Sequence, residues 1–427
     1  MNEWSSFDTI TKGKGIWLID SKGNKIIDAV GSMWCNVWGH SNPQLVKAIT
    51  KQSKQIQHSS LFNLTNEPAE KLAKNLIKIS PGMNKVFYSD NGSSAMEIAI
   101  KMALQYWKNI GEVKKTQIAT IENGYHGDTF GAMSVGYVPE FFRKFKKQLF
   151  STIQFPVPNK YRLPKGFTLS DYQNHCLEKI EKRFSKNNDI AAFIMESGAQ
   201  MAGGVIIYPK DFQKRIRELC KKYDILFVLD EIATGFGRLG SMVQYQDQKS
   251  IPDIVAYGKM LTGGYLTMAA TLANKKIYDS FSGDFNDWKH LFHGHTYTGN
   301  PIAAAVANEN LQMYEKYNLI KQVQKTSKIF EKYSQEILDI DIVGDVRHKG
   351  MLMGIELVSN KKKKTPIRTK KSINKVFFEE GKKQGIYLRT LGNIVMLVPP
   401  LSIQQNELEL LLKKTIKTIQ VAKSKTF

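Results

Sequence analysis

Two residues of opposite charge follow two short apolar runs, Asp230 after 225–229 and Lys259 shortly after 254–256. A buried carboxylate and a buried lysine together suit pyridoxal phosphate chemistry. In that chemistry a lysine holds the cofactor as a Schiff base and an aspartate keeps the ring nitrogen protonated. A desolvated lysine amine is also a usable nucleophile and general base. A structural ion pair would place the same two residues here, so their spacing alone leaves both interpretations open.

The apolar runs predict the strands that position these two residues. Each run is short, aliphatic and bounded by turn residues, as in the buried strands of a parallel sheet. Runs of the same kind at 85–89, 117–121, 190–195 and 267–273 alternate with helical patterns. Such alternation predicts a mostly parallel, doubly wound α/β sheet, which binds ligands beyond the carboxyl ends of its strands.

A tight turn, Asn91-Gly92-Ser93-Ser94, follows the first of these further strands. Asn-Gly is also typical of a hairpin turn, but the apolar residues that come next fall on one helical face. Ser94 and Glu97 are predicted to form a capping box at the start of this helix. Because a helix N-terminus offers unpaired backbone N–H groups, we expect Gly92 and Ser93 to bind a phosphate.

Aromatic and basic side chains elsewhere are candidates for a pocket. Tyr125 and His126 end a strand among glycines, where a ring could stack on a planar cofactor; a buried tyrosine that bonds the backbone is the alternative. Trp34, in a loop flanked by glycine and proline, is either a core residue or a pocket wall. Arg389 ends a short strand and could bind a carboxylate through two hydrogen bonds, or simply lie on the surface.

The composition argues against several other classes of protein. No apolar run is long enough to span a membrane, and the first 15 residues lack the apolar core of a signal peptide, so we expect a cytoplasmic enzyme. The three cysteines are widely spaced and predict no disulfide framework. His290, His293 and His295 do not have the spacing of a helical ligand pair, so no metal site is expected.

The charge is the unusual bulk property, with 61 Lys and Arg against 39 Asp and Glu and a formal net charge of +22. The basic residues are mostly lysines spread along helical segments, which is typical of solvated helix faces. One cluster at 361–364 is predicted to lie in an exposed loop. We therefore expect small-molecule substrates and no nucleic-acid partner.

Taken together, these motifs resemble the class III aminotransferases of the fold type I pyridoxal phosphate superfamily. KMALQYW, NGYHGDTFGAMSV, DEIATGFGR, GK-LTGG, HG-TY-GNP and R-LG----PP occur in order along nearly the whole chain. The resemblance implies a large pyridoxal-phosphate-binding domain at 46–309, with a mostly parallel seven-stranded sheet flanked by helices. It also implies a smaller α+β domain built from both termini, 1–45 and 310–427, and a homodimer with active sites at the subunit interface.

The resemblance assigns roles to individual residues. Lys259 would hold pyridoxal 5′-phosphate and shuttle a proton between the substrate carbon and the cofactor, and Asp230 would pair with the ring nitrogen. Tyr125 and Ile232 would face opposite sides of the ring. The remaining implied contacts are Gly92, Ser93 and His126 to the cofactor, Thr296 to the phosphate in the other subunit, and Trp34, Tyr125, Asp128, Arg238, Gly294, His295 and Arg389 to the substrate, Arg389 taking its carboxylate.

Within the family the chain is most similar to the branch of biotin biosynthesis that converts 7-keto-8-aminopelargonate to 7,8-diaminopelargonate. The implied reaction is a ping-pong transfer through the pyridoxamine form, with S-adenosylmethionine or L-lysine as donor. Met33-Trp34, Glu196-Ser197 and Met396 depart from the commoner pattern of the family near the donor pocket. FHGHTYTGN, GGYL and SLFNLTN look more like the branch that uses L-lysine.

Two other functions stay open at this point. A general ω-amino-acid or diamine transaminase would share the scaffold, because pocket changes alone alter the substrate. A basic nucleic-acid-binding protein that kept the fold without catalysis would bind no cofactor, and the intact Lys259 and Asp230 argue against it.

Overall fold

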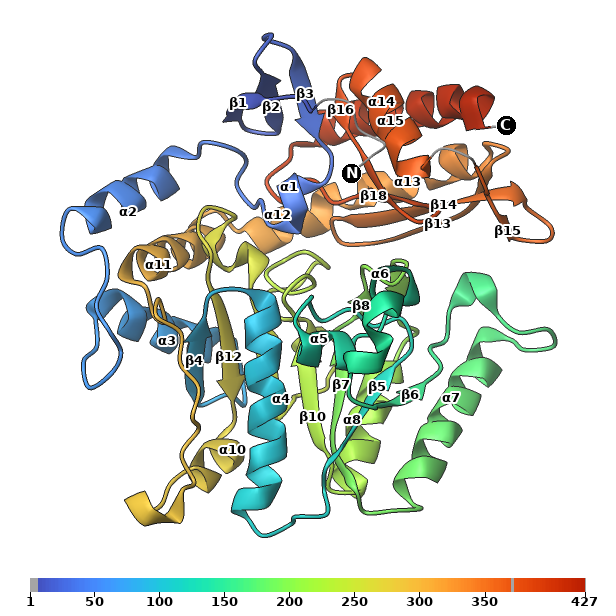
Figure 1. Ribbon diagram of the computed structural model, residues 1–427. Helices are drawn as coiled ribbons and strands as arrows, with labels where there is room; N and C mark the ends of the chain where they lie inside the picture. The colour runs from blue at the N-terminus through green and yellow to red at the C-terminus, as the bar shows by residue number, and fades with distance from the viewer. Residues whose placement is uncertain (1–6, 370–371, 427) are drawn as a thin grey trace.

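The computed structural model describes residues 7–369 and 372–426, and its largest element is a seven-stranded sheet (Figure 1). The strand order is β4-β12-β11-β10-β7-β5-β6. In this order the five strands β11, β10, β7, β5 and β6 are parallel to one another. Strand β12 is antiparallel to both of its neighbours, β4 and β11. This confirms the expected mostly parallel α/β sheet. The bounds are β4 Lys85–Ser89, β5 Gln117–Ile121, β6 Ile153–Phe155, β7 Ile190–Glu196, β10 Leu226–Asp230, β11 Ile254–Tyr257 and β12 Ala269–Ala273.

Helices cover both faces of this sheet, which explains why its central strands read as continuous apolar runs. Side chains of β10 alternate between two core clusters: Val228 packs with the alanines of α4 on one side, and Phe227 packs on the other. Figure 1 shows α4 lying across the front of the sheet. The covering helices include α4 Gly92–Asn109, α5 Phe130–Val135, α7 Leu169–Phe184 and α8 Phe212–Lys222. Every residue of β7 and β10 is buried, as a strand covered on both faces must be.

Two smaller sheets lie above the large sheet in Figure 1. One combines β1 Ile10–Lys14, β2 Trp17–Asp20 and β3 Lys25–Asp28 with β16 Ile386–Tyr387, which pairs in parallel with β3. The other contains β13 Val343–Lys349, β14 Leu352–Asn360, β15 Thr365–Pro366, β17 Arg389–Leu391 and β18 Ile394–Leu397. Their helices are α13 Lys328–Leu338, α14 Ile373–Lys383 and α15 Gln405–Thr426. The domain boundaries at 45 and 309 stay a prediction.

The remaining elements connect these layers. The sequence from Pro43 to His58 has a helical pattern throughout and predicts one helix over this range, but the helix in the structure ends at Ser53. Tertiary contacts hold the residues after it: the Nε2 of His58 contacts the carbonyl oxygen of Thr296 at 2.8 Å. The other elements are α1 Gly31–Trp34, α2 Pro43–Ser53, α3 Glu67–Ile79, α6 Pro139–Phe142, η1 Arg143–Gln148, η2 Lys160–Arg162, β8 Ala199–Gln200, β9 Ile206–Ile207, α9 Gln244–Asp247, η3 Lys259–Thr262, α10 Lys275–Ser280, η4 Phe285–Asp287, α11 Pro301–Lys316 and α12 Leu319–Thr326.

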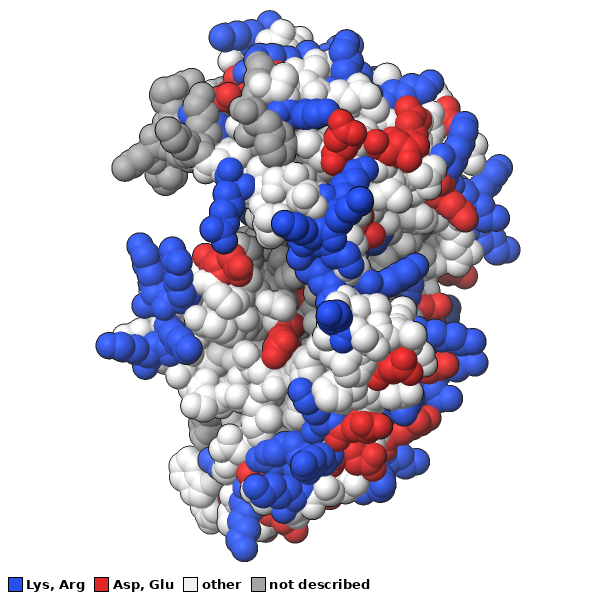
Figure 2. Space-filling view, turned by 90° about the vertical axis from the view of Figure 1, so that its right-hand side faces the viewer, with Lys and Arg blue, Asp and Glu red and all other residues white. Residues whose placement is uncertain are grey.

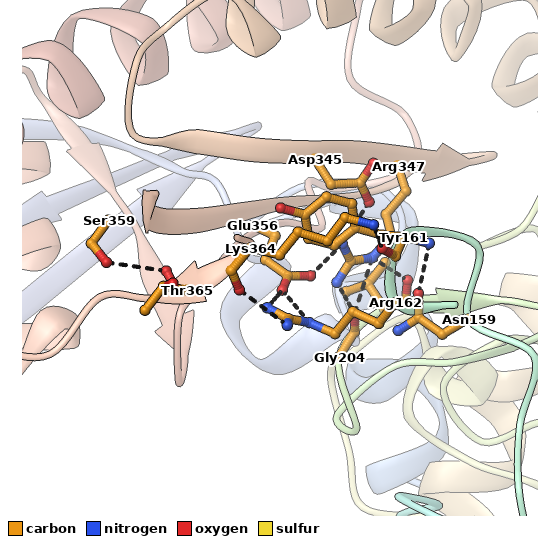
Figure 3. A network of polar contacts seen from close by, with 11 residues as sticks. Asn159, Tyr161, Arg162, Gly204, Asp345, Arg347, Glu356, Ser359, Lys364 and Thr365 are labelled. Carbon is orange, nitrogen blue, oxygen red and sulfur yellow. Dashed lines mark hydrogen bonds and ion pairs between the residues drawn. The ribbon is translucent and has the colours of Figure 1, made fainter. Parts of the chain in front are cut away.

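A buried carboxylate ties the five-stranded sheet to segments that adjoin the large sheet (Figure 3). Glu356 of β14 accepts hydrogen bonds from Arg162 Nε and Arg347 Nη1, each at 2.8 Å. The Nε of Arg347 also donates to the carbonyl oxygen of Val205 at 2.7 Å. Because Glu356 is only 4% exposed, these charge-assisted bonds fix how the two parts sit together.

Lys and Arg cover much of the face shown in Figure 2, with Asp and Glu side chains among them. Lys361 to Lys363 are exposed, as expected for a loop, and Lys364 is partly buried because its ammonium donates to the carbonyl oxygen of Tyr161 at 2.6 Å. Across the part of the chain that the structure describes, no helix has the length and apolar character needed to cross a membrane.

Candidate active site

Asp230 lies at the carboxyl end of the central strand β10, next to Glu196 at the end of β7. Its side chain is held from two directions. Oδ2 accepts from His126 Nδ1 at 2.8 Å, and Oδ1 accepts from the backbone N–H of Ile232 at 2.9 Å. With Asp230 only 4% exposed, the carboxylate is fixed and largely shielded from water.

Lys259 follows β11 after a single glycine and begins the short helix η3. Its φ of 43° is uncommon for a residue with a side chain, and such strain is concentrated at functional sites. The amine has no hydrogen-bond or ion-pair partner among the described residues, and it lies 5.3 Å from the centre of the Trp34 ring. Desolvation lowers the pKa of Lys259, while Asp230 and Glu196 act in the opposite direction. The lowered pKa increases the share of neutral, nucleophilic amine at a given pH.

Asp230 and Lys259 line one cavity of about 400 Å³. The cavity lies where the carboxyl ends of β7, β10 and β11 converge, the position expected for a ligand site in an α/β sheet. Its other lining residues are Trp34, Asn91, Gly92, Ser93, Tyr125, His126, Gly127, Asp128, Thr129, Glu196, Ile232, Ala233 and Thr234. The structure therefore brings together nine of the fourteen residues that the sequence predicted for the site, Lys259, Asp230, Tyr125, His126, Asp128, Gly92, Ser93, Ile232 and Trp34.

The N-terminus of α4 opens into this cavity, but its cap differs from the predicted one. Asn91 is the N-cap, and its side chain accepts from the backbone N–H of Ser94 at 3.0 Å. Glu97 instead accepts from the backbone N–H of Ala132 at 3.0 Å and from the hydroxyl of Thr129. The predicted Ser94–Glu97 capping box is wrong, because a segment more than thirty positions further along the chain engages the carboxylate.

Two glycines let the backbone come close around the end of α4. A Cβ on Gly92 would lie 2.8 Å from Cγ2 of Ile232, and one on Gly127 would lie 2.3 Å from Oγ of Ser93. Gly127 also has a φ of +127°, which side chains disfavour. Ser93 in turn shares a 2.8 Å hydrogen bond with the hydroxyl of Thr129. Gly92 and Ser93 of the first turn thus line the cavity together with Thr129, which places a helix N-terminus and hydroxyl groups side by side, as an anion site requires.

Tyr125 is half-buried at the side of the cavity. Its hydroxyl donates to Asp128 Oδ1 at 3.1 Å, and its ring stacks on Phe142 with centroids 6.1 Å apart. Burial, followed by the charge of Asp128, raises the pKa of the hydroxyl. The phenol is therefore neutral at physiological pH and acts as a flat apolar surface with a polar end.

Glu196 is a cavity residue that the sequence did not single out for a role. It is 3% exposed and accepts from the backbone N–H of Met201 at 2.9 Å and of Tyr125 at 3.3 Å. Burial raises the pKa of its carboxyl to about 7, with His126 lowering it and Asp230 raising it. Its position at the end of the strand beside that of Asp230 was the available signal, because residues in register on neighbouring parallel strands face the same side.

The two candidate arginines lie outside the cavity lining. Arg389 is partly exposed, and its Nη1 is 2.7 Å from the sulfur of Met33. Arg238 is fully buried and donates from Nη1 to the carbonyl oxygens of Pro399 and Met351, at 2.7 and 3.0 Å. Its Nε and Nη2 have no partner in the described part of the chain. Contact of either arginine with a substrate stays a prediction.

The loop that holds Gly294, His295 and Thr296 also lies outside the cavity of its own chain. His293 and His295 approach each other through their Nε2 atoms at 3.2 Å, and Thr296 is exposed. The described residues include no group of three or more metal-ligating side chains. A role for these three residues in the site of a second subunit stays a prediction.

The residues present fit a flat, anionic cofactor that bonds covalently to an amine. The amine of Lys259 has no described partner, and His126 Nε2 is buried without a hydrogen-bond partner among the described residues. The buried carboxylate of Asp230 and the N-terminus of α4 both line the cavity. These groups are the ones that pyridoxal 5′-phosphate requires.

Comparisons with known proteins point the same way. The family described as Aminotransferase class-III matches residues 2–419. The adenosylmethionine-8-amino-7-oxononanoate aminotransferase of Staphylococcus aureus is 44% identical over 95% of this chain and 90% of its own length. The crystal structure of the protein of that name from Methanocaldococcus jannaschii has a TM-score of 0.91 and 40% identity, covering 97% of this chain and 93% of its own. The structure of an omega transaminase from Pseudomonas jessenii in complex with PMP has a TM-score of 0.94 and 29% identity. The match covers 98% of this chain and 94% of that chain.

Proposed function

Because the chain belongs to the class III aminotransferase family, we propose that it is the transaminase of biotin biosynthesis that aminates 8-amino-7-oxononanoate. This acceptor is the compound also called 7-keto-8-aminopelargonate, and the product is 7,8-diaminopelargonate. The observation that carries the proposal is the shared cavity of Lys259 and Asp230. An amine without a described partner and a fixed carboxylate there meet the needs of a pyridoxal phosphate transaminase. The relatives of that printed name, alike over nearly their whole length, support the substrate.

The residues that would hold pyridoxal 5′-phosphate come from four segments. Lys259 would bind it covalently, and the first turn of α4 at Gly92 and Ser93 would bind its phosphate. Tyr125 and Ile232 would flank its ring. When bound, the cofactor supplies an electron sink that stabilises negative charge on the substrate carbon.

The chain's own groups then act in a defined order. Asp230, held by His126 and by the N–H of Ile232, would keep a proton on the ring nitrogen. The Nζ of Lys259 would accept a proton from the donor carbon and later return one to the acceptor. Because desolvation lowers the pKa of Lys259, a larger share of its amine is neutral and able to act as a base at a given pH. The walls formed by Trp34 and Tyr125 would keep bulk water from the reacting carbon.

The acceptor carries a carboxylate, for which Arg389 is the proposed anchor. No carboxylate is paired with Arg389 among the residues described, so its fork of donors can form two bonds to an incoming one. The donor is S-adenosylmethionine or L-lysine. The resemblance of FHGHTYTGN, GGYL and SLFNLTN favours lysine.

We also propose that the active form is a homodimer. Phe62, Phe292 and Tyr297 expose 73%, 65% and 61% of their surface close to the loop at 294–296. Phe62 lies beside Gly294, with 3.4 Å between its Cζ and a Cβ built on the glycine. Exposed aromatic residues gathered in this way are typical of protein interfaces. A second subunit on this surface would bring Thr296 to the phosphate in its neighbour.

A general omega transaminase is the second candidate. The likeness to the Pseudomonas jessenii enzyme, with a TM-score of 0.94, favours it as an alternative. The same fold and cofactor site would serve both activities, so only the substrate separates them.

A half-reaction tests the proposal and separates the two candidates. The purified holoenzyme is mixed with S-adenosylmethionine or with L-lysine, without acceptor, and the absorbance of the lysine-bound cofactor is followed. We expect one donor to remove that absorbance and 8-amino-7-oxononanoate to restore it. A response to putrescine or β-alanine alone would favour the omega transaminase. If no cofactor absorbance appears even after pyridoxal 5′-phosphate is added, the proposal is wrong.

A further inference from the structure

One wall of the cavity is built on a strained segment, 31–34. Ser32 has φ 61° and ψ −76°, close to a γ-turn conformation that is rare and strained for a residue with a side chain. Trp34 has a φ of 67°, which is unusual for a bulky residue. Such a backbone persists only where its surroundings determine it. The side chain that determines it here is Asp28.

Asp28 is the last residue of β3 and is fully buried. Its Oδ2 accepts from the backbone N–H of Ser32 at 2.7 Å and from the Ser32 hydroxyl at 3.2 Å. Its Oδ1 accepts from the backbone N–H of Val30 at 3.3 Å. One carboxylate therefore bonds both the residue that precedes the turn and the strained residue itself.

His40 holds Asp28 from the other side. Its Nε2 lies 3.0 Å from Asp28 Oδ2, and the side chain is 17% exposed. The backbone of His40 is itself fixed by two hydrogen bonds with Gly15, at 2.7 and 3.1 Å. The pair thus joins the strained turn to the amino-terminal sheet.

The turn carries two side chains that face proposed site residues. Trp34 is 6% exposed, and its ring lies 5.3 Å from the amine of Lys259. The sulfur of Met33 contacts Nη1 of Arg389. Asp28 also pairs in register with Tyr387, which precedes Arg389 by two positions along the chain. A change in the turn would therefore move the aromatic wall and the guanidinium together.

We propose that Asp28, supported by His40, is a positioning residue for the acceptor's carboxylate. It acts through the strained turn, which sets Trp34 over Lys259 and sets Met33 against Arg389. This inference rests on the proposed function, in which Arg389 binds that carboxylate. Asp28 itself touches neither substrate nor cofactor.

The chain offers a matched control in Asp20. Asp20 is 3% exposed and accepts from the backbone N–H groups of Lys22 and Asn24, each at 2.9 Å, in a turn that contributes nothing to the cavity. Replacing either aspartate by alanine removes a buried carboxylate that accepts hydrogen bonds from two backbone N–H groups of the following turn. Only Asp28→Ala should affect the site.

The test is the binding of nonanoate to the holoenzyme by calorimetry. Nonanoate carries the carboxylate but no keto group, so it binds without reacting. We expect Asp28→Ala to raise its Kd about tenfold or more, as loss of the bonds to a charged group implies. His40→Ala should raise it less, by about threefold, because Asp28 keeps its backbone partners. Asp20→Ala should leave the Kd unchanged.

A second readout separates positioning from general damage. The cofactor absorbance of Asp28→Ala should match the wild type, and the KM for the acceptor should rise by a larger factor than the donor half-reaction slows. If Asp28→Ala does not fold, the nonanoate Kd of His40→Ala becomes the test of the inference. An unchanged nonanoate Kd in the folded variants would overturn this inference. Failure of the wild type to bind nonanoate, or to react with any acceptor, would instead count against the proposed function.

Discussion

Asp230 and His126 meet through a 2.8 Å contact between Oδ2 and Nδ1, with both side chains buried. Because a carboxylate accepts, Nδ1 carries the hydrogen, and Nε2 is left buried without a described partner. Each carboxylate oxygen still has a free lone pair. The pair therefore fixes a buried acceptor in the lining of the cavity, where a bound ligand could supply the donor.

Replacing Lys259 by alanine should abolish turnover. No other amine among the described residues lines the cavity, and losing a positioned base slows a reaction by about 10²- to 10⁴-fold. Stopped-flow measurement of the donor half-reaction checks this. Lys115→Ala is the control, because Lys115 is also buried but lies away from the cavity. Wild-type turnover in Lys259→Ala would refute the role of this lysine.

Replacing Arg389 by alanine should raise the KM for the acceptor about 10- to 100-fold, because a bidentate bond to its carboxylate is lost. The half-reaction with the donor should change little. Arg389→Lys should recover only part of the loss, since lysine cannot form the paired bonds. Steady-state kinetics over both substrates gives the answer, and an unchanged acceptor KM would remove Arg389 from the site.

Replacing Gly92 by alanine should weaken cofactor binding about tenfold or more. The new Cβ would lie 2.8 Å from Ile232, which must move together with the first turn of α4. Equilibrium titration of the apoprotein with pyridoxal 5′-phosphate measures the effect. Gly111→Ala, at a φ of +87° with open space around it, should cost stability and leave the affinity unchanged. Equal affinity in both variants would contradict the proposed phosphate site.

Glu196→Gln should change how the stability of the apoprotein depends on pH. Burial raises the pKa of Glu196 from 4.5 to about 7, so the folded state binds a proton that the unfolded state has lost between these values. The unfolding free energy contributed by this carboxyl therefore falls as pH rises through that window. The total is of the order of 3 kcal/mol, at about 1.4 kcal/mol per pKa unit.

Denaturant unfolding at several pH values between about 4.5 and 7 is the measurement. The variant should gain stability relative to the wild type as the pH rises. Glu231→Gln is the matched comparison, because burial raises the pKa of Glu231 to about 7 as well, and it should show the same trend. If the difference in unfolding free energy between Glu196→Gln and the wild type does not change with pH, the pKa of Glu196 is the same in the folded and unfolded states, and this prediction is wrong.

The proposed dimer surface can be tested by replacing its aromatic residues. Phe62→Ser together with Phe292→Ser should shift the protein toward monomers, because much of the exposed apolar area is lost. Analytical ultracentrifugation measures the change. Val113→Ser removes a side chain that is equally exposed, at 66%, on another part of the surface, and should leave the assembly as it is. A double variant with unaltered assembly would place the interface elsewhere.

The sequence predicted the strands more reliably than the contacts between distant segments. The runs at 85–89 and 117–121 match β4 and β5, because an apolar run bounded by turn residues has few alternatives once both faces are covered. The helix after Pro43 was predicted too long, because the chain from Lys54 onward bonds to a loop more than two hundred positions away. No local pattern contains that information.

The candidate site shows the same division. Asp230 and Lys259 could be predicted because strand ends in a parallel sheet converge. Glu97 was assigned to a helix cap because its partners, Thr129 and Ala132, are visible only in three dimensions. Arg238 has the residue type of a carboxylate ligand, yet its guanidinium bonds to backbone carbonyl groups of distant segments. Residue type and spacing cannot separate these outcomes.

The parallel pairing of β3 with β16 has a consequence for synthesis on the ribosome. Ile27 and Ile386 lie in register, although about 360 positions separate them. A nascent chain folds from its amino-terminal side as it emerges. Strand β3 is therefore synthesised long before β16, the strand that pairs with it in parallel. During that time β3 can pair with β2 alone, and Trp34 lacks Met396 and Val398, which belong to its core cluster. A complete active site can therefore form only after the last part of the chain has been released.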